Sequence, residues 1–318
     1  MKNSTLILTL SLIIFLFSCK EEDPLTNEPG TYSSKDSFKV EQAVGASEMA
    51  ISNISHLIQL AIDQEQVFHN NGIIYPIITK EKENPNQTDI YPMILTLDFG
   101  LDTNQGYDNR YRSGKIVARI SSYWKDSLST IEADVQNYYM ATHTPNYING
   151  QNQVFITECN SNMKLYITNN GLTNSFDNTY YPTQYIIADS AKISTPLGSI
   201  TFSTQRNTYY TNGFDTPTYE DDKTINTLLS GGTASDKNNN NWQWDLENLE
   251  STDEGLSYFA YNRNCFWLIS GNIKLNYKDI KAERAQTNII EFGKSDQSSC
   301  DNISSYLTNG LNIVFNLP

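Results

Sequence analysis

The segment CFWLISGNIKLNY, residues 265–277, decides the fold of this chain. Every second position in it is apolar, aromatic or glycine: Cys265, Trp267, Ile269, Gly271, Ile273, Leu275 and Tyr277. Successive side chains of a strand point to opposite faces of a sheet. An alternation with a period of two therefore predicts a β-strand that buries one face.

The same alternation recurs along the rest of the chain. It predicts three further sets of inward side chains: Ile116, Ala118, Ile120 and Ser122; Ile131, Ala133, Val135, Asn137 and Tyr139; and Leu311, Ile313, Phe315 and Leu317. Polar clusters at 168–171 (TNNG) and 236–241 (DKNNNN) predict turns between strands. Close turns indicate antiparallel pairing, because parallel strands need long crossover connections. We therefore expect residues 69–318 to be mainly β, as a large antiparallel sheet or sandwich.

One N-terminal segment, residues 38–68, has a helical pattern instead. Its apolar side chains recur at steps of three and four, at Val40, Val44, Ile51, Ile54, Ile58 and Ile62. The steps lapse over 45–50, where Ser47 could begin a second helix. Asn70-Asn71-Gly72 is a typical helix stop. We expect the isoleucine stripe to pack on the sheet; a coiled coil or a helix lying on a membrane is the alternative.

The N-terminus has the features of an export signal, residues 1–18. Lys2 is followed by an apolar run over 6–17, which is shorter than the roughly 20 residues that a spanning helix needs. The run ends in Leu16-Phe17-Ser18-Cys19, which resembles the lipobox of bacterial lipoproteins. The resemblance implies cleavage before Cys19 and a lipid on its thiol, which would attach the protein to a membrane. An ordinary signal peptide with a chance cysteine is the alternative.

Acidic residues follow Cys19 directly, at Glu21, Glu22 and Asp23. This cluster resembles the surface-export signal of Bacteroidetes lipoproteins, which implies the outer membrane as the location, with exposure at the cell surface. Residues 19–37 lack apolar periodicity and are expected to form a flexible tether. The formal net charge of −14 argues against nucleic acid or anionic lipid as a partner.

A motif occurs twice in the chain. Residues 98–100 (DFG) and 291–293 (EFG) are each followed, after seven residues, by Asp-Asn, at 108–109 and 301–302. The matched spacing predicts two related β units, residues 90–200 and 201–318.

The C-terminal motifs also carry a family resemblance. Cys265-Phe266-Trp267, Ser270-Gly271, Glu291-Phe292-Gly293 and Cys300-Asp301-Asn302 resemble the motifs of a group of uncharacterised Bacteroidetes lipoproteins. The chain departs from the group's pattern at Glu291, where aspartate is usual. The resemblance implies an envelope location and a β architecture, and it brings no activity.

Three cysteines remain after Cys19: Cys159, Cys265 and Cys300. Export places them in an oxidising compartment, where disulfides form. We expect a disulfide between Cys265 and Cys300, because both lie in the C-terminal β region. An odd number leaves one thiol over, or a pairing with another chain.

Metal and catalytic signals are weak. His56, His69 and His143 lack the spacing of a metal site. In the loop at 102–108, Asp102, Asn104 and Asp108 could supply oxygen ligands to calcium, although Asp and Asn also form Asx-turns without an ion. No residue is assigned a catalytic role and no other cofactor is expected. Whether the chain is an enzyme stays open, with a non-catalytic role favoured.

Trp242 and Trp244 are the strongest binding signal. Being two residues apart on an expected strand, they would face the same side and could stack on sugar rings; the alternative is that they belong to the core. We therefore expect a cell-envelope lipoprotein with a non-catalytic binding or structural role, whose ligand is a glycan or a host-surface protein. The alternative is a surface-anchored hydrolase of polysaccharide or peptide that uses paired carboxylates.

Overall fold

Strands dominate this computed structural model, which describes residues 40–72, 75–108, 110–141, 147–148, 151–152, 158–174, 178–195, 197–215, 223–248, 256–259, 268–281, 283–292, 303–308 and 311–316. Helix α2 (Val40–Asp63) and the 3₁₀ helix η1 (Glu65–Gly72) come first. The strands are β1 (Ile77–Lys82), β2 (Met93–Asp98), β3 (Asn104–Gln105), β4 (Tyr111–Ile120), β5 (Thr130–Ala141), β6 (Tyr147–Ile148), β7 (Gln151–Asn152), β8 (Glu158–Asn174), β9 (Tyr180–Thr195), β10 (Gly198–Asn212), β11 (Lys223–Asp236), β12 (Asn241–Asn248), β13 (Leu256–Phe259), β14 (Leu268–Asp279), β15 (Ala285–Phe292), β16 (Ile303–Thr308) and β17 (Leu311–Asn316).

Fifteen of the described strands form one antiparallel sheet. Its path runs β1-β2-β4-β5-β8-β9-β10-β11-β12-β14-β15-β16-β17, and β3 and β13 pair beside it. The fold class is therefore mainly β, with a large antiparallel sheet and one N-terminal helix, as the sequence predicts. Strands from residues 90–200 and from residues 201–318 share this sheet, and their origin by duplication stays a prediction.

The inward set predicted for β5 is right only in its first half. Ile131, Ala133 and Val135 are buried, but the register then shifts and Tyr138 is buried in place of Asn137. Asn137 has a φ of 48°. It lies against Gly114 of β4, where a Cβ would overlap the Asn137 carbonyl oxygen. This β-bulge adds one residue to the strand and reverses the faces of everything that follows.

One of the two predicted turns is also wrong. Residues 168–171 lie inside β8, where Gly171 has a φ of 68° at a register shift against β9. The second turn is confirmed, since β11 ends at Asp236 and β12 begins at Asn241. There the Asp236 carboxylate accepts hydrogen bonds from the backbone N–H groups of Asn238 (2.9 Å) and Asn240 (2.8 Å).

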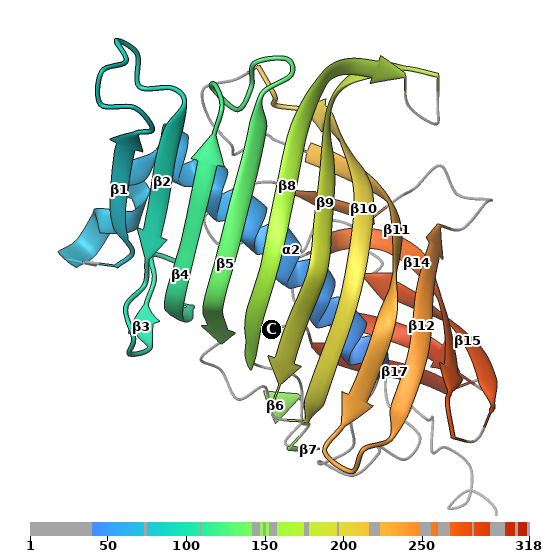
Figure 1. Ribbon diagram of the computed structural model, residues 1–318. Coiled ribbons are helices and arrows are strands. Elements are labelled where there is room, and N and C mark those ends of the chain that lie inside the picture. Colours follow the sequence, from blue (N-terminus) through green and yellow to red (C-terminus); the bar gives the residue numbers. More distant parts are fainter. Residues whose placement is uncertain are drawn as a thin grey trace, which may run out of the picture. The chain divides into compact units, whose positions relative to one another are not determined.

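Helix α2 crosses one face of the sheet diagonally (Figure 1). It is continuous through 45–50, and the Ser47 hydroxyl donates to the Val44 carbonyl (2.7 Å) within it, so the predicted second helix start is wrong. Packing of the stripe is confirmed, because Ile51, Ile54 and Ile58 lie in one apolar core with the inward side chains of the strands. Among the described residues, no helix is long and apolar enough to cross a membrane.

The polar side of α2 is enclosed as well, and residues 40–61 are all buried. Polar side chains of the sheet bond to two of its residues: the Asn288 amide of β15 donates to Glu41 (2.6 Å), and the Gln59 amide donates to Gln184 of β9 (3.0 Å). The bond to Asn288 also shows that the sheet curls far enough for β15 to reach the start of α2 (Figure 1).

A buried ion pair joins α2 to β10. The Arg206 Nη2 lies 2.7 Å from the Glu48 Oε2, and neither side chain is more than 2% exposed. Burial raises the pKa of Glu48, and Arg206 partly offsets this rise. Because water does not reach this place, each charge is stabilised mainly by the other.

Replacing one member of this pair should cost far more stability than replacing both. Arg206→Met leaves a buried carboxylate without its cation, and we expect the free energy of unfolding to fall by about 3–5 kcal/mol. The double variant Glu48→Leu/Arg206→Met should recover most of this loss, because apolar side chains then fill the same space. Urea unfolding at pH 7 measures both. A double variant as unstable as Arg206→Met would contradict the prediction.

Candidate binding site on the outer face of the sheet

Two consecutive glycines lie in the middle of β11, at Gly231 and Gly232. Because side chains alternate along a strand, the two positions belong to opposite faces of the sheet. Gly232 pairs with Phe202 of β10 and with Trp244 of β12. Gly231 pairs with Ser203 and with Asp245 of the same two strands. The two glycines therefore leave one position without a side chain on the inner face of the sheet and the neighbouring position without one on the outer face.

On the inner face, Gly232 permits a close approach that no other residue allows. A Cβ at this position would overlap the Thr201 carbonyl oxygen and would lie 2.7 Å from the Cα of Phe202. The neighbouring rings fill the space above it, since the Phe202 and Trp244 ring centroids are 6.0 Å apart. Aromatic side chains commonly cover a strand glycine in this way.

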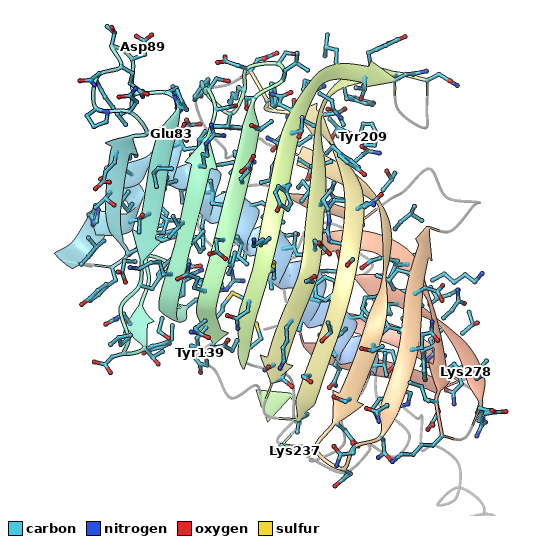
Figure 2. The ribbon with its side chains drawn as sticks, in the orientation of Figure 1. Glu83, Asp89, Tyr139, Tyr209, Lys237 and Lys278 are labelled. Atoms are coloured by element: carbon cyan, nitrogen blue, oxygen red, sulfur yellow. The ribbon has the colours of Figure 1, made fainter. Side chains whose placement is uncertain are left out.

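On the outer face, the missing side chain of Gly231 leaves a depression. It is an open hollow of about 420 Å³, lined by Ser203, Thr204, Gln205, Leu229, Ser230, Gly231, Asp245 and Leu246. A Cβ at Gly231 would meet its nearest atom, the Trp244 carbonyl oxygen, at 3.1 Å. Figure 2 shows this face of the sheet, turned away from α2, with Lys237 in the β11–β12 turn and Lys278 on β14 marking the strands on either side of β12. We call this hollow the Gly231 depression.

Hydrogen bonds across the strands hold its polar side chains in place. The Ser203 hydroxyl donates to Asp189 of β9 (3.3 Å), and the Asn276 amide of β14 donates to Asp245 (2.9 Å). The Tyr185 hydroxyl donates to the Gln205 side-chain oxygen (3.0 Å). A hydroxyl, an amide and a carboxylate are thus presented at the rim in fixed positions.

Apolar side chains adjoin these groups on the same face. Leu229 is 67% exposed and Tyr166 of β8 is 39% exposed. The two belong to one cross-strand row, in which Tyr166 pairs with Ile187, Ile187 with Gln205, and Gln205 with Leu229. We call this line of four side chains the outer row. It gives the depression an apolar extension over β9 and β8.

The two tryptophans predicted to bind sugar flank this site on the other face. Trp242 and Trp244 do share one side of β12, as their spacing predicts, and it is the side turned toward the core. Trp244 is only 2% exposed, while Trp242 is partly buried against the core. Stacking of sugars on this pair stays a prediction.

The predicted calcium loop contributes to a buried cluster. The Asp108 carboxylate accepts from Arg112 Nη1 (2.5 Å) and Nη2 (2.6 Å), and Arg112 Nε donates to the Tyr138 hydroxyl (2.9 Å). That hydroxyl donates in turn to Asn53 of α2 (2.7 Å). Burial alone would raise the pKa of Asp108, but the adjacent Arg112 and Arg110 lower it below its usual range. The carboxylate is therefore anionic at neutral pH and ties the loop to the helix.

The other two predicted ligands are placed differently. The Asn104 amide donates to the Phe99 carbonyl (2.8 Å) and to the Asp102 carbonyl (2.7 Å), so its side chain bonds to the nearby backbone. Within the described residues, no three His, Cys, Asp or Glu side chains gather as a metal site would require. Calcium binding at this loop stays a prediction.

The remaining predicted residues lie partly outside the described ranges. Cys19, Cys265, Cys300 and His143 fall there, so the lipid anchor and the disulfide stay predictions. Cys159 is buried in β8, with 1% of its surface exposed. His56 is buried in α2, and burial lowers its pKa to about 3, so its imidazole is neutral at pH 7.

Known proteins give no further guide to the site. Comparison with protein families, with curated proteins and with solved structures finds no match to this chain. The depression itself was missed by sequence reasoning, although one signal was present. Two glycines inside an alternating run, Leu229-Ser230-Gly231-Gly232, indicate a close approach of another group to the strand.

The two glycines should respond very differently to substitution by alanine. Gly232→Ala places a methyl group into the β10 backbone, and we expect the free energy of unfolding to fall by about 1–3 kcal/mol. Gly231→Ala places the same methyl group 3.1 Å from the Trp244 carbonyl oxygen, a tight contact that a small backbone shift relieves, and should change the free energy of unfolding by less than about 1 kcal/mol. Urea unfolding, monitored by tryptophan fluorescence, measures the free energy of unfolding of both variants. Equal losses would show that the two faces of β11 are not as described.

Proposed function

We propose that this chain is a non-catalytic binding protein of the cell envelope, held at the outer membrane by a lipid on Cys19, and that its ligand binds in the Gly231 depression. The observation that carries the proposal is the depression itself. Its volume of about 420 Å³ lies within the roughly 300–1,000 Å³ of typical ligand sites. Its rim combines an apolar side chain with a few fixed polar groups, as such sites do.

The position of the depression also favours binding. All of its lining residues belong to β10, β11 and β12, which lie inside the sheet with strands on both sides. A site built on strands is positioned more accurately than one built on loops. Little order has to be imposed when a ligand arrives, so little of the binding free energy is lost to ordering.

The location rests on the N-terminal sequence. Leu16-Phe17-Ser18-Cys19 supports lipid attachment, and the acidic residues after Cys19 support export to the outer membrane with exposure at the cell surface. The resemblance of the C-terminal motifs to Bacteroidetes lipoproteins supports the same location. A surface protein of this kind would meet ligands from outside the cell.

Filling the depression tests the binding role. Gly231→Val places a β-branched side chain, which strands favour, into the hollow. Thr233→Val introduces the same residue on the same face of β11, at a position that does not line the depression. The full chain in a sugar-free zwitterionic detergent would be titrated calorimetrically with three chemical classes: neutral oligosaccharides, polyamines and anionic oligosaccharides.

We expect at least one class to bind, with affinity reduced about tenfold or more by Gly231→Val, a loss of about 1.4 kcal/mol. Thr233→Val should bind within about twofold of the natural chain, because its side chain does not line the hollow. Binding that Gly231→Val leaves unchanged, or no binding by any class, would overturn the proposed role.

The anchor has its own test. Cys19→Ala should abolish metabolic labelling with a radioactive fatty acid and move the protein from the membrane fraction to the soluble fraction, because lipid is the expected attachment. Cys159→Ala, in which another cysteine is replaced, should keep both the label and the membrane location. Label retained on Cys19→Ala would contradict lipidation at this residue.

A further inference from the structure

The hydrogen-bonding groups at the Gly231 depression point to a class of ligand, an inference that rests on the binding role proposed above. Gln205 accepts the Tyr185 hydroxyl with its oxygen, and its amide N–H groups donate to no acceptor among the described residues. Asp245 accepts the Asn276 amide with Oδ2, and its Oδ1 accepts from no donor in the described part of the chain. A donor and an acceptor therefore face solvent on either side of Gly231.

Hydroxyl groups are the natural complement to this arrangement. Each hydroxyl donates one hydrogen bond and accepts others, so neighbouring hydroxyls of one ligand can satisfy Gln205 and Asp245 together. Ser203, which pairs with Gly231 directly, adds a third hydroxyl-compatible group on the same strand as Gln205, across Gly231 from Asp245. A ring that carries several adjacent hydroxyls fits this rim better than a ligand with a single polar group.

The apolar groups suit the same ligand. A sugar ring carries C–H groups as well as hydroxyls, and the exposed Leu229 can contact them at the wall of the depression. Tyr166 lies three strands from Leu229 along the outer row, which is about 14 Å at the usual strand spacing. Its exposed ring offers a face on which another sugar could stack. A chain of several sugars would reach both places.

The charges near the depression select against anions. Asp245 pairs with Gly231, Asp189 accepts the Ser203 hydroxyl, and the chain has a formal net charge of −14. Anionic sugars would be repelled by these carboxylates. A polyamine could pair with Asp245, but it would leave the Gln205 N–H groups without an acceptor, a loss that neutral hydroxyls avoid.

We infer that the Gly231 depression binds one ring of a neutral oligosaccharide through Ser203, Gln205 and Asp245, and that the following rings extend along the outer row to Tyr166. The reaction is reversible binding, and no bond of the sugar is broken. The ligand is thereby specified as uncharged and at least several sugars long.

Calorimetry on the full chain, in the same sugar-free detergent, tests this class. The probes are hexasaccharides of β-1,4-glucose, α-1,4-glucose, β-1,4-mannose and β-1,4-xylose, with spermidine and hexagalacturonate as the cationic and anionic probes. We expect at least one neutral hexasaccharide to bind and the two charged probes not to bind. Gln205→Ala and Asp245→Ala should each weaken binding about tenfold, since each removes a hydrogen bond to the sugar, whereas Thr233→Val should not.

A comparison of ligand lengths tests the outer row. Tyr166→Ala should weaken the hexasaccharide by about tenfold or more, because its stacking contact is lost, and should leave the disaccharide of the same series unchanged. Equal weakening of both lengths would overturn the extension along the outer row.

The outcomes separate the two proposals. If spermidine or hexagalacturonate binds in a manner that Gly231→Val abolishes, and no neutral probe binds, the saccharide inference fails while the binding role stands. Neutral binding that survives Gln205→Ala and Asp245→Ala also overturns the inference. If no probe of any class binds, both proposals fail.

Discussion

The burial of helix α2 against the sheet is the constraint on which the rest of the structure depends. An amphipathic helix at a protein surface usually leaves its polar side in water. Here residues 40–61 are all buried, so the polar side must find its partners inside the protein. An unmatched charge or amide in such a place costs several kcal/mol. Arg206, Tyr138 and Gln184 supply such partners from three strands of the sheet.

These contacts also connect the core to the candidate binding site. Arg206 directly follows Gln205 in β10, so the residue that pairs with Glu48 inside is next to one that lines the depression outside. Trp244 and Asp245 have the same relation in β12. Because neighbouring residues of a strand point to opposite faces, packing on the helix side fixes the positions of the polar groups on the other side.

Periodicity was sufficient to predict most of the architecture. The alternation at Ile116, Ala118 and Ile120 and the stripe at Ile51, Ile54 and Ile58 each depend only on neighbours in the sequence, and both are confirmed. The bulge at Asn137 could not be predicted in this way, because one extra residue is set by the partner strand rather than by the local pattern.

The candidate site was harder to predict for a related reason. The Gly231 depression is produced by an absent side chain between Ser203 and Asp245, residues that only the strand register brings together. At Asp108, the sequence offers a carboxylate in a loop, and only the fold shows that this carboxylate pairs with Arg112. At both places, the residue types alone predicted the site less well than the contacts that the fold creates.

The hydrogen bond between Glu41 and Asn288 spans 247 positions of the chain. Synthesis begins at the N-terminus, so α2 is complete long before its last partner exists. Contacts this distant in sequence form slowly, because a long loop must close before they stabilise anything. The beginning of α2 can therefore complete its contacts only when β15 has been made, so an early segment of the chain is among the last to reach its final packing.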